Sequence, residues 1–253
     1  MADDDNRRAQ LKASHTRQAI RSRLASGPVH SYLRDFIYGA IDGAVTTFAI
    51  VSGVAGADLS NSIVIILGVA NLIGDGFSMA AGNFLGVRAE RQQRELLRAM
   101  EHQHISDYPE GEREEVREIF RQKGFEDNDL DRAVEIITGN RERWVQTMLT
   151  EEHGVPLTGP SAIRAALVTF AAFLLVGAIP LLTFLFDYFG MSMDDPFFWS
   201  ATLTGVAFFL TGALKCRFVE QSWVSAGLET LAVGGSAAAL SYVVGALLGG
   251  LAR

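Results

Sequence analysis

Two aspartates stand inside long apolar segments of this 253-residue chain, and they are the first residues whose chemistry stands out. Asp42 lies in Phe36–Gly56 and Asp75 lies in Ile63–Val87, and neither segment has another charged residue. An ionisable side chain at membrane depth costs at least about 2.5–3.5 kcal/mol and usually has a functional role. We therefore expect both aspartates to act in function. The structural alternative is that they pair with Lys215 or with the backbone.

Other potential ligands share the helical faces of these aspartates. Asn71, Asp75 and Met79 recur at four-residue steps, which places them on one stripe of an α-helix. Asp35 precedes Asp42 by seven residues and shares its face at the mouth of the segment. Carboxylates prefer hard or borderline cations and methionine sulfur prefers softer ones, so the mixture suits a divalent transition metal better than Na⁺ or Ca²⁺. The alternative for Met79 is ordinary apolar packing.

A second group of potential ligands follows the second apolar segment, on stretches with helical periodicity. It consists of three pairs at three- or four-residue spacing: Glu101 and His104, Glu112 and Glu115, and Met148 and Glu152. Glu-x-x-His is a spacing found in carboxylate-bridged metal sites of helical bundles. Each pair alone also fits a solvated helix surface, but together they favour metal capture.

A third candidate, Glu229, lies in the last apolar segment. Carboxylates that gain and lose protons can couple proton movement to metal movement, and we assign this role as a hypothesis to Asp42, Asp75 and Glu229. For Glu229 the alternative is an ion pair with Lys215 or Arg217 near the membrane edge.

The elements that must position these residues are apolar helices. Hydrophobic residues make up 49% of the chain, and its mean hydropathy is +0.19. Crossing the hydrocarbon takes about 20 mostly apolar residues in a helix. Five segments meet or approach this requirement: Phe36–Gly56, Ile63–Val87, Ala165–Phe186, Phe197–Leu214 and Trp223–Leu251. The sequence therefore predicts an all-α membrane protein with five transmembrane helices.

The stretch Arg88–Pro156, here called the insert, separates the second and third spans and holds 17 acidic against 11 basic residues. Its expected helices are Arg88–His104 as a continuation of the second span, Glu110–Lys123, Leu130–Thr138 capped by Asp129, and Arg141–His153 capped by Asn140. The predicted organisation is a basic tail (1–34), two spans (35–87), an acidic helical metal-binding insert (88–156) and three further spans (162–253).

The distribution of basic residues predicts the orientation. Ala57–Ser62 and Asp187–Pro196 contain no Lys or Arg, and an amino terminus in the cytoplasm leaves 21 of the 22 basic residues inside, Arg253 being the exception. The tail and the insert are then cytoplasmic and the carboxyl terminus lies outside. The absence of an organelle transit peptide favours a bacterial inner (plasma) membrane.

Composition excludes several other classes. The net charge of −7 argues against nucleic acid as a partner. The single cysteine, Cys216, can form neither an intramolecular disulfide nor a cysteine-based metal site. The expected partners are divalent metal ions, protons and the lipid bilayer.

These motifs together resemble the vacuolar iron transporter family. The resemblance rests on RDFIYGAIDGAVTTFAIVSGVAG in the first span, GDGFSMAAGNFLGVRAE at the end of the second, and the acidic insert, and it covers roughly Ser31 to the carboxyl end. It implies a homodimer of five-span subunits that exports Fe²⁺ from the cytosol in exchange for protons, without a resident cofactor. It also implies the metal ligands: Asp42 and Met79 in the membrane, Asp35 at the entrance, and Glu101, Glu112, Glu115, Met148 and Glu152 in the cytoplasmic domain.

The sequence departs from the family pattern at three positions. His104 stands where the family often has Glu, Leu149 where a second Met occurs, and Asn71 where an intramembrane Glu occurs. Histidine is a competent ligand, whereas leucine cannot ligate. Asp75 lies one turn from Asn71 on the same face, so we infer that it substitutes for the missing carboxylate.

The sequence thus predicts a proton-coupled exporter of a divalent transition metal, with no catalytic residue. Fe²⁺ is the first expectation and Mn²⁺, Co²⁺ and Zn²⁺ are alternatives, because first-row metals follow one affinity order and geometry decides between them. The competing hypotheses are a membrane-tethered ferroxidase and a metal-sequestering or metal-sensing protein. Against the ferroxidase, the insert has one Glu-x-x-His where di-iron bundles use two.

Overall fold

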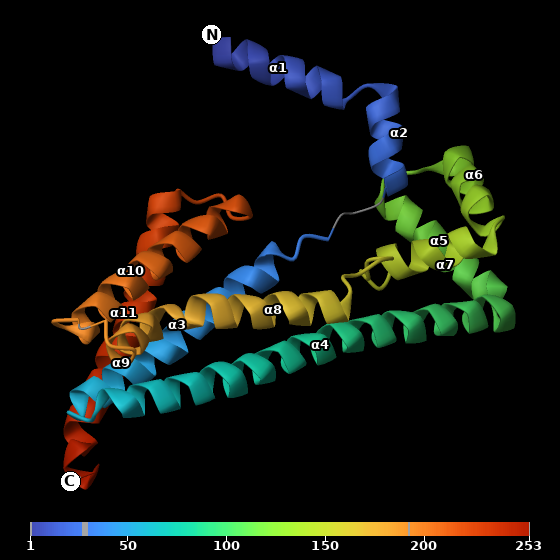
Figure 1. Ribbon diagram of the computed structural model, residues 1–253. Helices are drawn as coiled ribbons and strands as arrows, with labels where there is room; N and C mark the ends of the chain where they lie inside the picture. The colour runs from blue at the N-terminus through green and yellow to red at the C-terminus, as the bar shows by residue number, and fades with distance from the viewer. Residues whose placement is uncertain (1, 27–29, 192, 253) are drawn as a thin grey trace. The chain divides into compact units, whose positions relative to one another are not determined.

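The computed structural model describes residues 2–26, 30–191 and 193–252 of the chain. The chain divides into two compact units, Met1–Ser31 and Tyr32–Arg253. All regular secondary structure in the described ranges is helical (Figure 1), which confirms the predicted all-α fold class.

The first unit contains two short helices, α1 (Ala2–Ser14) and α2 (Arg17–Ser26). Most of the basic tail predicted over 1–34 belongs to this unit. Residues 1 and 27–29 of that predicted tail, and Arg253 at the opposite end of the chain, lie outside the described residues.

The second unit contains the long apolar helices and the insert. Its elements are α3 (Leu33–Gly56), α4 (Asn61–Asp107), α5 (Pro109–Gln122), α6 (Asp127–Thr138), α7 (Arg141–Glu151), α8 (Ala162–Gly177), α9 (Ile179–Tyr188), α10 (Pro196–Leu214), η1 (Lys215–Arg217), α11 (Trp223–Leu248) and η2 (Gly249–Ala252). Figure 1 shows α4 extending beyond the other long helices, with α5, α6 and α7 gathered at its far end.

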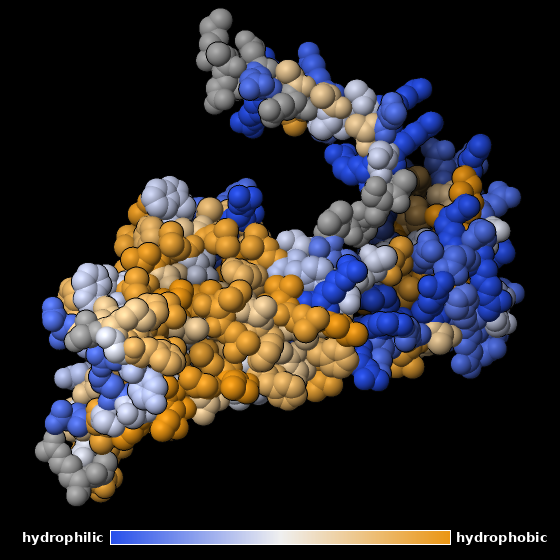
Figure 2. Space-filling view, viewed as in Figure 1, coloured by the Kyte–Doolittle hydropathy of each residue, from blue (hydrophilic) through white to orange (hydrophobic). Residues whose placement is uncertain are grey.

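Four helices, α3, α4, α10 and α11, are long and apolar enough to cross a membrane, and the pair α8–α9 makes a fifth if it crosses as one bent span. Figure 2 shows the hydrophobic surface over these helices giving way to a hydrophilic surface over the insert. The positions agree with the five predicted segments, and the structure adds a bend of 50° within the third.

The bend has a local cause at Pro180. Proline has no N–H to continue the helical hydrogen bonds, so α8 ends at Gly177 and α9 begins at Ile179. The carbonyl oxygen of Pro180 accepts a hydrogen bond of 2.6 Å from the buried Ser200 hydroxyl of α10. A backbone group at membrane depth must be satisfied by protein in this way.

Helix α3 lies at the centre of the second unit and packs against α8, α11, α4 and α10. Its glycines permit a close approach of α8. A Cβ atom on Gly39 would lie 2.4 Å from the Thr169 carbonyl oxygen, and one on Gly43 would lie 2.5 Å from the Phe173 carbonyl oxygen. The small-residue face around Asp42 therefore receives α8.

The insert is a small helical bundle at the end of α4. Helix α4 continues without a break through Val87 to Asp107, as the lack of a helix breaker predicted. Asn140 caps α7, since its Oδ1 accepts a hydrogen bond of 2.9 Å from the Arg143 backbone N–H. The predicted Asp129 cap is wrong: α6 begins at Asp127, and the Glu126 carbonyl accepts the Asp129 and Leu130 N–H groups.

A Gly43→Ala substitution should lower the free energy of unfolding of the detergent-solubilised protein by roughly 1–3 kcal/mol, because the added methyl group would clash with the backbone of α8. Gly235→Ala is the control, since within the described structure no atom of another segment lies within 4 Å of that position. Thermal unfolding of both variants checks the prediction. Equal midpoints would contradict the close contact of α3 with α8.

Candidate metal site

Two buried carboxylates form the centre of the insert. Glu101 of α4 is 1% exposed and Glu112 of α5 is 5% exposed. In each, the Oε2 atom is buried and has no hydrogen-bond partner among the described residues. A buried carboxylate without compensation is unfavourable, so this pair has the chemistry of a site that receives a cation.

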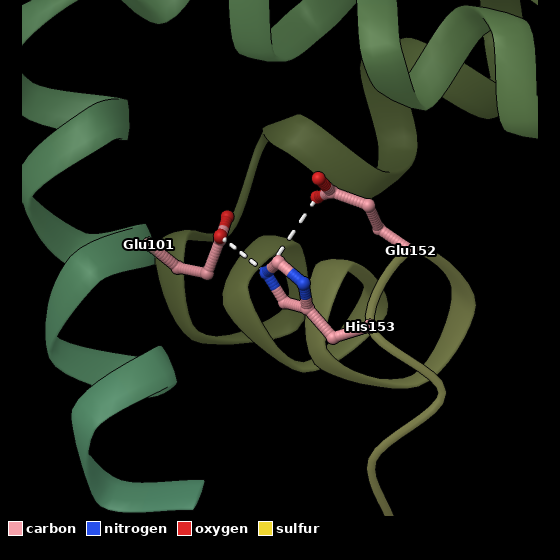
Figure 3. A group of neighbouring side chains, drawn as sticks. All are labelled: Glu101, Glu152 and His153. Atoms are coloured by element: carbon pink, nitrogen blue, oxygen red, sulfur yellow. Dashed lines mark hydrogen bonds and ion pairs between the residues drawn. The ribbon is translucent and has the colours of Figure 1, made fainter. Parts of the chain in front are cut away.

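His153 completes a compact ligand group with Glu101 and Glu152 (Figure 3). Its Nε2 lies 2.8 Å from Glu101 Oε1 and 3.8 Å from Glu152 Oε2. Potential ligand atoms of the three residues all lie within 4.8 Å of one another. Carboxylate oxygen and imidazole nitrogen together suit first-row divalent metals.

His104 and Glu115 lie at the exposed edge of the same cluster. His104 Nδ1 is 3.3 Å from Glu112 Oε1, and its side chain is half exposed. Burial raises the pKa of Glu112 to about 7, and the charges of Glu101, Glu115 and Glu152 add to the effect while His104 opposes it. Near neutral pH, Glu112 therefore carries a proton part of the time.

Burial also raises the pKa of Glu152, although the neighbouring His153 opposes the shift. Met148 of α7 is fully buried in the apolar core of the insert, beside Val145 and Leu149. All six residues predicted for the insert therefore lie on the three elements that meet here, α4, α5 and the end of α7. The five titratable residues interact electrostatically with one another, whereas Met148 packs in the apolar core of the insert.

Sequence reasoning missed His153. The prediction extended the last helix of the insert through His153 and paired residues by helical spacing, whereas α7 ends at Glu151. Beyond it the chain turns, and Gly154 adopts a positive φ of 63°. The turn brings the imidazole back toward α4. A histidine adjacent to Glu152 and followed by glycine was the available signal.

In the apolar helices, Asp42 of α3 is half-buried and interacts electrostatically with Asp75 of α4. One turn away, Asn71 Nδ2 donates a hydrogen bond of 3.3 Å to the Thr46 hydroxyl. The structure thus brings the predicted stripe of α4 against the Asp42 face of α3. Met79 is half-buried and packs against the apolar core of the long helices.

Asp35 has a partner that the sequence analysis did not identify. Asn83 Nδ2 lies 2.9 Å from Asp35 Oδ1 and 2.8 Å from the Thr169 hydroxyl. Asn83 follows Met79 by four residues, so it extends the same stripe by one turn. The spacing was the signal: the stripe runs along α4 to the level of Asp35.

Glu229 of α11 is engaged with two side chains near η1. Its Oε2 lies 3.5 Å from Lys215 Nζ and 3.4 Å from Gln221 Nε2. This is the pairing that sequence reasoning set against a proton-coupling role.

The apolar helices and the insert define a multi-pass membrane protein with an acidic helical domain that carries candidate metal ligands. A sequence profile described as the VIT family matches residues 33–246. The chain therefore belongs to the VIT family, which confirms the resemblance seen in the motifs.

The names of similar proteins agree with this family assignment. The vacuolar iron transporter of Toxoplasma gondii is 34% identical over 224 residues, covering 86% of this chain and 74% of that protein. Vacuolar iron transporter 1 of Arabidopsis thaliana is 32% identical over 213 residues, covering 83% of each. The protein of the same name from Oryza sativa subsp. japonica is 30% identical over 238 residues, covering 92% of this chain and 91% of that protein. These names describe transporters rather than enzymes.

The raised pKa of Glu112 predicts how stability depends on pH without metal. Between the usual glutamate value of 4.5 and about 7, the folded protein holds a proton that the unfolded chain has lost, so stability falls as the pH rises through about 7. Glu112→Gln should therefore stabilise the chelator-treated protein at pH 8 by about 1–2 kcal/mol, after allowance for solvent screening, and change little at pH 5.

Thermal unfolding at the two pH values provides the test, with Glu135→Gln on the exposed surface of α6 as the control. An equal effect of Glu112→Gln at both pH values would show that Glu112 does not titrate as described.

Proposed function

We propose that this protein moves Fe²⁺ across a membrane, out of the cytosol and in exchange for protons. The observation that carries the proposal is the pair of buried carboxylates, Glu101 and Glu112, in a member of the VIT family. Each has an oxygen without a hydrogen-bond partner among the described residues, and Glu101 contacts His153. The relatives named iron transporters favour Fe²⁺ as the substrate. Mn²⁺, Co²⁺ and Zn²⁺ have compatible ligand preferences and are the alternatives.

The insert captures the metal in this proposal. A divalent cation bound by Glu101, Glu152 and His153 offsets the charge repulsion among the buried carboxylates. Glu112 and His104 border the same space, and Glu112 must lose its proton before it can ligate. Binding of metal therefore releases protons on the side of the membrane where the insert lies.

The apolar helices carry the metal onward. Asp35 receives the ion at the mouth, and Asp42 with Met79 binds it at membrane depth. Helix α4 supports this order, because one uninterrupted helix carries Glu101 in the insert and Met79 and Asp75 in the span. Protonation of Asp42 or Asp75 from the far side then weakens the ligands and releases the metal.

A second copy of the chain completes the path. Asp75 is exposed on the surface of α4 in the single chain, and a Cβ atom on Gly74, Gly82 or Gly86 would meet no other segment of the described chain within 4 Å. An exposed carboxylate in a membrane span needs a polar or protein environment, and small residues permit close helix packing. A homodimer joined along this face of α4 supplies both.

In this proposal the tail and the insert lie in the cytoplasm and the carboxyl end lies outside, and the distribution of basic residues supports this orientation. The 88–156 segment then acts as the cytoplasmic metal-binding domain of a five-span subunit. The outer loops carry acidic residues and no Lys or Arg, in agreement with this orientation.

A metal-sequestering function is the second candidate, since the insert alone supplies a ligand cluster. The two functions differ in the role of the membrane residues: sequestration needs none of them. Ferroxidase activity is disfavoured by family membership, and oxygen consumption by the Fe²⁺-loaded full chain would reveal it directly.

Transport requires Asp42 and Met79, which sequestration does not. In proteoliposomes with an acidic lumen, Asp42→Asn should reduce Fe²⁺ uptake at least about tenfold, since a ligand is lost. Met79→Leu keeps the volume but removes the sulfur, and should reduce uptake as well. A dye trapped in the lumen reports the metal, and a second dye reports proton efflux.

The matched controls are Asp194→Asn and Met191→Leu, which change the same residue types in an exposed loop. Uptake by the Asp42→Asn variant equal to that of its control, with metal binding intact in both, would favour sequestration and overturn transport.

Metal capture requires Glu101. Glu101→Gln should weaken Co²⁺ binding by the full chain by on the order of tenfold or more, because it removes a buried carboxylate ligand. Glu135→Gln, on the exposed surface of the insert, should bind as the wild type does. Calorimetric titration measures both, and equal affinities would place the metal elsewhere.

A further inference from the structure

A large cavity lies at the junction of the insert with the apolar helices. Its volume is about 1110 Å³. One wall is the part of α4 from Phe84 to Arg98, and the other is the 157–163 segment that leads into α8. Figure 2 shows the hydrophobic surface of the apolar helices meeting the hydrophilic surface of the insert. The metal ligands described above do not line it.

Four arginines of α4 line this cavity, against two glutamates. Two of the arginines are paired: Arg91 with Glu95 at 2.8 Å, and Arg98 with Glu142. The other two, Arg88 and Arg94, have no ion pair within the described part of the chain. The Arg94 Nε atom is buried and lacks a hydrogen-bond partner there. Glu90 is the other glutamate of the lining, so the charged side chains described around the cavity leave a net positive charge.

The segment before α8 also contributes to the cavity. It packs against Arg94: a Cβ atom added to Gly159 would lie 2.8 Å from Arg94 Nη2. Ser161 and the first turn of α8 also line the cavity, and the Ser161 side chain does not cap this helix. Free N–H groups of a first helical turn favour negative charge.

Part of the cavity lining is apolar. It includes Phe84, Val87, Leu157 and Ile163, and Ile163 is 62% exposed. Phe84 and Val87 belong to the end of the second apolar segment, so we expect this part of the lining to lie near the hydrocarbon boundary. A freely soluble anion would not need such a surface, whereas a phospholipid presents a phosphate and acyl chains together.

We propose that this cavity binds the phosphate headgroup of an anionic membrane lipid in the leaflet on the side of the insert. Arg88 and Arg94 hold the phosphate, because a guanidinium donates paired hydrogen bonds to phosphate oxygens. Phe84, Val87 and Ile163 contact the first part of the acyl chains. Basic pockets beside transmembrane helices recognise lipid headgroups in this manner.

The bound lipid stabilises the packing of the insert against the membrane helices. The cavity is lined by α4, by the segment before α8 and by Gln146 and Leu149 of α7, so one ligand contacts all three. Leu149 also belongs to the apolar core of the insert. Occupancy should therefore raise the thermal stability of the whole second unit, whether or not the protein transports metal.

The test is thermal unfolding of the full chain in detergent with added phosphatidylglycerol, phosphatidylcholine or inorganic phosphate. Phosphatidylglycerol should raise the midpoint of the wild type by several degrees, and the other two additives should not. The double variant Arg88→Gln/Arg94→Gln should lose most of this rise. Arg132→Gln/Arg217→Gln, which removes two exposed arginines away from the cavity, should keep it.

An equal rise with phosphatidylcholine, or retention of the rise by the cavity variant, would overturn the proposal. A rise with inorganic phosphate alone that matches the lipid would assign the cavity to a free anion instead, and so overturn the lipid. If the double variant does not fold, native mass spectrometry of Arg94→Lys decides. This variant keeps the charge but loses the paired geometry, so weaker retention of phosphatidylglycerol than in the wild type supports the site, and equal retention contradicts it.

Discussion

The electrostatic cost of burying Glu101 and Glu112 together constrains the whole insert. Both carboxylates are withdrawn from water, each has an oxygen without a partner among the described residues, and their charges repel. The apo protein meets this cost partly by holding a proton on Glu112 and partly through His153 and His104. In the proposed function, a divalent cation bound by these carboxylates compensates their charges, and its binding releases the proton of Glu112.

Helix α4 connects this cluster with the membrane. It runs 47 residues without a break, carrying the polar stripe of Asn71, Asp75, Met79 and Asn83 in its apolar half and Glu101 in its acidic half. Gly39 and Gly43 permit the close packing of α3 on α8, and Asp42 of α3 interacts electrostatically with Asp75 of the stripe. In the proposed function, this uninterrupted helix carries both the capture residues and the membrane residues, so no flexible linker separates them.

Much of this arrangement could be predicted from local sequence patterns. The spans followed from apolar length, the continuous α4 from the lack of a breaker after Val87, and the α7 start from Asn140. The misses depended on backbone geometry or on distant partners: the bend at Pro180, the start of α6 at Asp127, and the approach of His153 to Glu101 across 52 residues. Helical spacing identifies residues on one face, but it cannot identify the element that a turn brings against them.

The most direct test of the central claim is a proton count during metal binding. Calorimetric titration of the full chain with Co²⁺ at pH 7, in two buffers with different ionisation enthalpies, gives the number of protons released. Because the pKa of Glu112 is raised to about 7, the wild type should release roughly half a proton more than Glu112→Gln. Equal release by the two proteins would contradict the account, since the metal would then bind without engaging the buried carboxylate pair.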